Sequence, residues 1–239
     1  MDAHIFRRIA AELAPRMVGA RVHKIYSLAP ETLLFVFTVK TEDAARKFYL
    51  IFDHSRASPA LFAVPEKPQA PERPTAAAMR LRKYIQGRHV RAAHSHWAHR
   101  ALTLDFSNPA GTEPLLLILN LAPPPGRPAV ILHQTPGLEF ESEPAWPGLE
   151  LEPGPAHLPG ILASHSAWRD FPVLTPLLRK TLALLPPPDQ AALMADLLAG
   201  NGDIFVYEEA DGEAGKISSP PLLSAWPLPE PLRRGRAER

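Results

Sequence analysis

Short strand-like segments that follow one another without room for a helix constrain this fold most. The first three cover residues 21–26, 32–39 and 47–52. Parallel neighbours need a crossover of about a dozen residues or more, so these segments are expected to pair antiparallel. The later strand patterns cover 88–94, 100–106, 115–121, 128–133 and 137–141. This succession predicts an α+β chain with mainly antiparallel sheets.

Helical periodicity occurs before, within and after this region. Apolar residues recur every four positions from Ile5 to Met17, which predicts an amphipathic helix. A second helix is expected to begin at Pro74 and to end at Gly87, because proline suits the first turn and glycine the left-handed cap. Two short helices are expected at 172–185 and 188–199.

The 29 prolines predict short elements and many loops, because proline disrupts helix interiors and central strands. Residues 142–169 show little periodicity. The expected divisions are a β-rich domain at 1–141, a linker at 142–169, a short helical segment with terminal strands at 170–232, and a disordered basic tail at 233–239.

Several classes of protein are not expected. The chain has no cysteine, which excludes disulfides, thiolate zinc sites and cysteine nucleophiles. The first residues do not form a secretory signal, and no apolar run approaches the roughly 18 residues of a membrane helix. We therefore expect a cytoplasmic protein that does not contact membranes.

The charge is divided between the two parts of the chain. Residues 1–100 contain 17 Lys and Arg against 8 Asp and Glu, whereas residues 101–239 contain 9 against 17. A molecule polarised in this way can present a positive face to nucleic acid while its net charge is only +1. The alternative is two ordinary solvated surfaces.

Residues 73–100 are the most basic segment, with seven Lys and Arg and no acidic residue. Cations in such a cluster can contact phosphates. The candidate RNA contacts from this segment and from the first strand are Arg80, Arg82, Lys83, Arg88, Arg91, Arg100, Arg21 and Lys24. The alternative is a solvated helix face beside a strand edge that charge protects.

Four histidines in the same region raise the question of a metal. They are His89, His94, His96 and His99. Their neighbours are cationic and no carboxylate lies nearby in the sequence, so we expect no metal. Phosphate-binding loops, nucleophile elbows and recognisable catalytic triads are also missing from the sequence, and we expect neither a cofactor nor enzyme activity.

Two stretches resemble segments of the NFACT family, which includes bacterial fibronectin-binding protein A chains and eukaryotic ribosome-quality-control factors. The first is LAPRMVGARVHKIY at 13–26, and the second is LRKYIQGRHV at 81–90. Weaker similarities occur at 172–178 and 217–222. The resemblance is good over residues 1 to about 135, and the order and spacing of the motifs support it.

The resemblance implies a role in rescuing stalled translation. Family members bind tRNA and an obstructed large ribosomal subunit, so the expected partners are tRNA or rRNA and that subunit. Their amino-terminal domain shares the fold of the same domain in formamidopyrimidine-DNA glycosylases, a β-sandwich flanked by helices. Those enzymes use an amino-terminal proline as nucleophile. Because Met1 lacks the secondary amine, glycosylase chemistry is not expected here.

The chain departs from the family pattern in two ways. The Asp-Arg pair that members use for tRNA corresponds to His99-Arg100, so His99 joins the candidate site although the acid is lost. The usual coiled coil and carboxy-terminal domain do not follow within the 239 residues, which implies a fragment or a reduced form. Alanine tailing by this chain alone is therefore not expected, and a longer partner chain is a candidate partner.

The sequence thus predicts a non-enzymatic RNA- and ribosome-binding domain. One alternative is a protein-binding module of the kind that the fibronectin-binding name implies. Another is a reduced module that docks on protein partners through its acidic half.

Overall fold

The computed structural model describes residues 1–40, 44–71, 73–108, 114–121, 128–133, 157–200, 203–209, 221–233 and 236–238. The chain divides into two compact units. The first contains Met1 and Phe6–Ala145, and the second contains Asp2–Ile5 and Trp146–Arg239. The strand expected at 137–141 lies outside the described residues.

The first unit contains two four-stranded sheets in which neighbours along the chain pair antiparallel. One sheet consists of β1 (Arg21–Ala29), β2 (Thr32–Lys40), β3 (Ala45–Asp53) and β4 (Ala60–Val64). The other consists of β5 (Ala92–His96), β6 (Ala101–Asp105), β7 (Leu116–Asn120) and β8 (Ala129–His133), and the short 3-10 helix η1 (Trp97–His99) joins β5 to β6. The predicted α+β fold with antiparallel sheets is confirmed.

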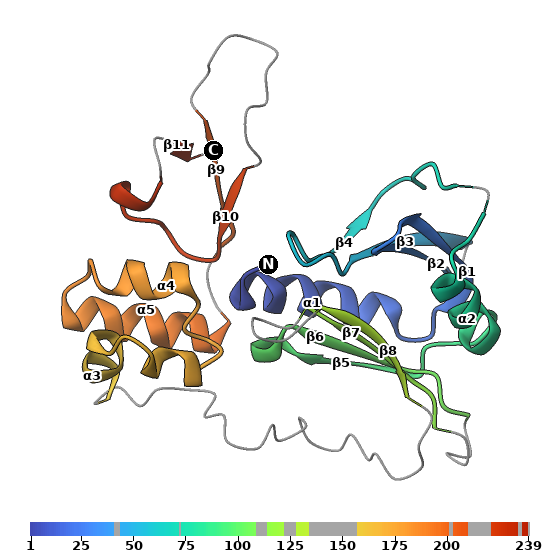
Figure 1. The fold of residues 1–239 in the computed structure, drawn as a ribbon, viewed down its shortest axis with the longest axis horizontal. Helices are drawn as coiled ribbons and strands as arrows, with labels where there is room; N and C mark the ends of the chain where they lie inside the picture. The colour runs from blue at the N-terminus through green and yellow to red at the C-terminus, as the bar shows by residue number, and fades with distance from the viewer. Residues whose placement is uncertain are drawn as a thin grey trace. The chain divides into compact units, whose positions relative to one another are not determined.

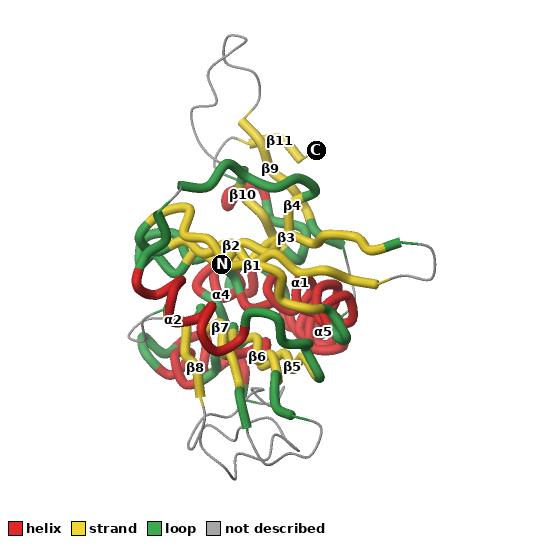
Figure 2. Tube along the Cα trace, turned by 90° about the vertical axis from the view of Figure 1, so that its right-hand side faces the viewer, coloured by secondary structure: helices red, strands yellow, loops and turns green. Residues whose placement is uncertain are grey.

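Helix α1 (Ala3–Met17) runs between the two sheets, which Figures 1 and 2 show as separate layers. Its apolar stripe, which includes Phe6 and Leu13, joins one hydrophobic core with residues of both sheets, such as Phe35 and Leu117. Helix α2 (Ala76–Ile85) adds a buried face to the same core. Because each strand alternates its side chains, the odd-numbered residues of β2 from Leu33 to Phe37 point into this core.

The second unit combines short helices with a small sheet. Its helices are α3 (Leu158–Ala163), η2 (Ala167–Asp170), α4 (Pro176–Leu182), α5 (Pro187–Ala199) and η3 (Glu230–Leu232). Its strands pair antiparallel in the order β10 (Leu222–Ser224), β9 (Phe205–Glu209) and β11 (Arg236–Glu238). Trp226 is buried in this unit and donates a hydrogen bond of 3.0 Å from its Nε1 to Thr181 Oγ1.

The structure differs from several local expectations. The segment expected to be a linker at 142–169 includes α3 and the start of η2, which at six and four residues are too short for a periodic signal. The tail expected to be disordered contains β11, which pairs with β9. The strand expected to begin at residue 88 begins at Ala92, and β4 was not predicted. Strands of three to five residues show too little alternation of apolar and polar side chains to be recognised in the sequence. Whether such a segment forms a strand depends on its pairing with a neighbouring strand.

Candidate nucleic-acid interface

Residues 87–90 join the end of α2 to the start of β1 through backbone hydrogen bonds. The amide of Gly87 donates to Val22 O at 2.8 Å, and the amide of Val22 donates to Arg88 O at 2.9 Å. The amide of Val90 donates to Ala20 O at 2.8 Å. Gly87 has a φ of +85°, a left-handed conformation that side chains disfavour, and it lets the chain leave α2 alongside β1. The basic segment that follows α2 and the basic strand β1, which lie far apart in the sequence, are therefore fixed side by side.

Helix α2 presents its cations because its other face is occupied. Ala78, Leu81 and Ile85 are buried in the core, which leaves Arg80 and Lys83 exposed to solvent. The helix begins at the N-cap Thr75, whose Oγ1 accepts a hydrogen bond of 3.3 Å from the amide of Ala78. The core and the cap together determine which side of α2 is basic.

Four arginines near this helix are held by backbone carbonyl oxygens. Arg21 Nε donates to Gly87 O at 3.0 Å, and Arg82 Nε donates to Ile25 O at 2.7 Å. Arg88 and Arg91 each donate from Nη1, to Phe106 O at 3.5 Å and to Asn108 O at 3.4 Å. A carbonyl fixes a guanidinium without cancelling its charge, so these side chains are positioned and remain cationic.

We call seven cations on β1, α2 and residues 88–91 the basic junction. They are Arg21, Lys24, Arg80, Arg82, Lys83, Arg88 and Arg91. None of them forms an ion pair with a carboxylate in the part of the chain that the structure describes. Among the described residues the basic junction is therefore a positive surface without an ion-pair partner, and it contains all the sequence-predicted contacts except His99 and Arg100.

Cations of the basic junction and one neighbouring lysine surround the ring of Tyr26 on β1. The ring of Tyr26 is 5.1 Å from Lys24 Nζ, 4.3 Å from Lys67 Nζ and 5.6 Å from Arg82 Cζ. Burial raises the pKa of Tyr26, but the hydrogen bond to Lys67 and the charges of Lys67 and Lys24 outweigh it and lower the pKa overall. Sequence reasoning missed Lys67, which lies in the connection from β4 to α2 and carries no periodic signal.

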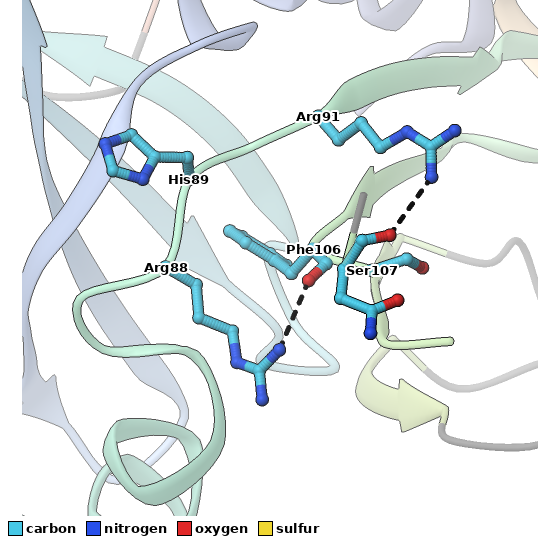
Figure 3. Close-up of a pocket in the computed structure, with 6 residues that line it drawn as sticks. Arg88, His89, Arg91, Phe106 and Ser107 are labelled. Atoms are coloured by element: carbon cyan, nitrogen blue, oxygen red, sulfur yellow. Dashed lines mark hydrogen bonds between the residues drawn. The ribbon is translucent and has the colours of Figure 1, made fainter. Parts of the chain in front are cut away.

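A hollow of about 490 Å³ lies beside the basic junction (Figure 3). Its lining residues are Arg88, His89, Arg91, Phe106, Ser107 and Asn108. Figure 3 shows the side chains of Arg88 and Arg91 reaching from one segment toward the residues that follow β6. The hollow thus brings two guanidinium groups together with a histidine, an amide and a hydroxyl, whereas Phe106, which also lines it, is buried in the hydrophobic core.

The sequence of this chain matches the family model described as NFACT N-terminal and middle domains over residues 2–121. The chain belongs to the NFACT family. The match covers α1, both meanders up to β7 and every residue of the basic junction. A comparison with curated protein sequences gives no match for this NFACT chain.

Three solved structures share the fold of this NFACT chain. The amino-terminal domain of fibronectin-binding protein PavA from Streptococcus pneumoniae is 14% identical with a TM-score of 0.56, covering 88% of this chain and 92% of that one. The amino-terminal part of the fibronectin/fibrinogen-binding protein of Streptococcus suis is 15% identical with a TM-score of 0.59, covering 98% and 96%. The fibrinogen-binding protein of Staphylococcus aureus is 14% identical with a TM-score of 0.61, covering 93% and 94%. At these identities the likeness shows the fold.

The two remaining candidate contacts, His99 and Arg100, lie apart from the basic junction. Arg91 precedes β5 and His99 follows it, so the five residues of β5, about 16 Å when extended, separate the two groups. Arg100 has a φ of 56° and donates from Nη1 to Met1 O at 2.9 Å. Burial and the charge of Arg100 lower the pKa of His99. The contact between Arg100 and Met1 is tertiary, so sequence proximity alone does not reveal it.

In the part of this NFACT chain that the structure describes, no helix has both the length and the apolar character that crossing a membrane requires. The same residues include no cluster of three or more side chains suited to a metal ion.

Proposed function

We propose that this NFACT domain binds RNA through the basic junction and acts in the cytoplasm in quality control of stalled translation. Its partners in this role are tRNA or rRNA on the large ribosomal subunit. The role is one of binding, without a catalytic step of its own. His99 and Arg100, which follow β5, form a second contact in this proposal; its support is the resemblance of this pair to the tRNA-binding pair of the family.

One observation carries this proposal. Four of the five arginines of the basic junction are fixed by backbone carbonyl oxygens, and no described carboxylate pairs with the seven cations. An array of positioned charges loses little side-chain entropy when it meets phosphates. Membership of the NFACT family supports the choice of RNA as the polyanion.

Charge reversal of the exposed members tests the proposal. Arg80, Lys83 and Arg91 are exposed, and Arg80 and Lys83 lie on the solvent side of α2. The variant with all three changed to Glu should fold normally, which circular dichroism and thermal melting would verify. We expect it to lose co-sedimentation with large ribosomal subunits and binding to tRNA, because each phosphate contact becomes a repulsion.

A matched control separates local binding from overall charge. Arg46, Lys47 and Arg56 are exposed outside the basic junction, and changing them to Glu alters the net charge equally. This control should keep most of the sedimentation and tRNA binding. Equal loss in both triple variants, or no loss in the first, would contradict the proposal.

The names of the structural neighbours favour a second candidate function, binding of fibronectin or fibrinogen. All three neighbours are described as fibronectin- or fibrinogen-binding proteins. This function requires exposure at the cell surface, which labelling of intact cells would detect. Binding to immobilised fibronectin that survives in the Arg80, Lys83 and Arg91 variant would favour this second function over RNA binding.

A further inference from the structure

The connection between β4 and α2 repeats one residue type at a fixed interval. Proline occupies every third position of residues 65–74, which we call the proline segment: Pro65, Pro68, Pro71 and Pro74. Proline holds its own φ near −65° and pushes the preceding residue toward extended conformations. The sequence therefore favours a polyproline II helix, which has three residues per turn and so places the four prolines along one edge.

The backbone of the proline segment is not engaged by the rest of the described chain. Neither a helix nor a strand includes its described residues, 65–71 and 73–74. Their backbone N–H and carbonyl groups form no hydrogen bond to other residues that the structure describes. None of these residues is buried, and Pro65, Pro71 and Arg73 are exposed. Rings and carbonyl oxygens of the segment are thus accessible to another molecule.

Both ends of the proline segment and one residue within it are fixed to the first unit. The segment follows Val64, the last residue of β4. It ends before Thr75, whose amide donates a hydrogen bond of 3.3 Å to Ser27 Oγ on β1. Between these ends, Lys67 Nζ lies 4.3 Å from the centre of the Tyr26 ring. A segment restrained in this way loses little conformational entropy when a partner binds it.

The residues 68–73, PQAPER, give the proline segment a direction. In a polyproline II helix Pro68 and Pro71 are one turn apart, about 9 Å, and Arg73 lies about 6 Å further along. Arg73 forms no ion pair with a described carboxylate. Domains that recognise such segments bind the prolines in a groove lined with aromatic side chains. An acidic pocket at one end of that groove would pair with the guanidinium of Arg73.

We propose that the proline segment is a docking site for a partner protein, whose aromatic groove binds Pro68 and Pro71 and whose acidic pocket binds Arg73. A protein fits better than RNA, because a phosphate is itself an acceptor and gains nothing from carbonyl oxygens and proline rings. The inference goes beyond the proposed RNA binding and does not depend on it, since the basic junction contains none of these three residues.

The test uses the whole folded chain and, as its probe, an isolated SH3 domain that binds ligands of the pattern Pro-x-x-Pro-x-Arg. Titration calorimetry should show saturable binding of the wild-type chain. Chemical-shift changes in the labelled SH3 domain should be confined to its aromatic groove. Pro68→Ala and Pro71→Ala should each weaken binding about tenfold, because two ring carbons leave a buried contact. Arg73→Gln should also weaken it about tenfold, because a charged hydrogen bond is lost.

Two exposed residues outside the proline segment provide matched controls. Pro227→Ala and Arg56→Gln remove the same groups elsewhere and should leave the affinity for the SH3 domain unchanged. Circular dichroism would verify that every variant is folded. The proposal is overturned if the wild-type chain does not bind the SH3 domain saturably, or if the controls weaken binding as much as the variants of the segment do.

Binding of tRNA separates this proposal from the proposed function. The three variants of the proline segment should bind tRNA as the wild-type chain does. Loss of tRNA binding in these variants, without binding of the SH3 domain by the wild-type chain, would assign the segment to RNA and overturn the docking site. Unchanged tRNA binding together with no SH3 binding would overturn the docking site and leave the proposed RNA binding standing.

Discussion

Tyr26 shows how single residues of the basic junction influence one another. Cations from three elements meet at its ring: Lys24 from β1, Lys67 from the connection after β4, and Arg82 from α2. A cation over an aromatic face is worth about 0.5–1 kcal/mol at an exposed site. The ring of Tyr26 therefore offsets part of the repulsion between these three cations. Without the ring, that part of the repulsion would be relieved only by a bound RNA phosphate.

The substitution Lys67→Ala should raise the pKa of Tyr26 toward the ordinary tyrosine value of 10.0, because Lys67 supplies a hydrogen bond and a charge that favour the phenolate. Tyrosinate absorbance during an alkaline titration would measure this. The chain has four tyrosines, so the Tyr26→Phe variant is needed to assign the transition. A transition that stays at the same pH in Lys67→Ala would refute the proposed coupling.

His96 should make the stability of the first unit depend on pH. Burial and the charges of His94 and His99 lower its pKa from the usual 6.5. Between the lowered pKa and 6.5 the unfolded chain binds more protons, so stability is fully present above about pH 6.5 and falls as the pH decreases through the folded-state pKa.

Urea unfolding at about pH 5 and about pH 7.5 would measure this effect across the titration range of histidine. The difference between the two midpoints should shrink in His96→Gln. It should persist in His23→Gln, because His23 is exposed on β1. An unchanged difference in His96→Gln would show that other groups cause the pH dependence.

At the scale of elements, the start of α2 depends on one hydroxyl. Thr75 Oγ1 accepts the amide of Ala78 and also shares a hydrogen bond of 2.6 Å with Ser27 Oγ on β1. Thr75→Ala should lower the free energy of unfolding by about 1–2 kcal/mol, since the N-cap and the hydroxyl–hydroxyl bond to Ser27 are lost while the amide of residue 75 still donates to Ser27 Oγ. Chemical denaturation would measure the loss, and Thr75→Ser, which keeps the hydroxyl, should recover most of it. Equal losses in the two variants would exclude the cap as the cause.

The elements also show how far the sequence predicts the structure. The apolar stripe from Ile5 to Met17 and the long strands β2 and β3 have strong periodicity, and they form as expected. The sequence did not predict that α2 lies beside β1, because backbone pairing of residues 87–90 with 20–22 creates this arrangement. Lys67 and Asn108 reach the site through tertiary contacts, which no local pattern of residues encodes.

At the scale of the whole molecule, the net charge of +1 is too small to attract RNA from a distance. Binding should therefore depend on the local array of the basic junction. For a single strand, the logarithm of affinity falls with the logarithm of salt concentration with a slope of about −0.7 per phosphate neutralised. If all seven cations of the basic junction bind phosphates, the slope should be no steeper than about −5.

Removing two exposed cations should change this slope by a calculable amount. Arg80→Ala with Lys83→Ala should make it shallower by about 1.4, because two phosphates lose their partners. Anisotropy titrations of a labelled single-stranded RNA across a range of salt concentrations would measure both slopes. Arg46→Ala with Lys47→Ala removes the same charge outside the basic junction and should leave the slope unchanged, since counterion release depends on the cations in contact. A slope near zero in the wild-type chain would mean that its affinity for RNA does not come from phosphates, and the basic junction would then have no electrostatic role in binding.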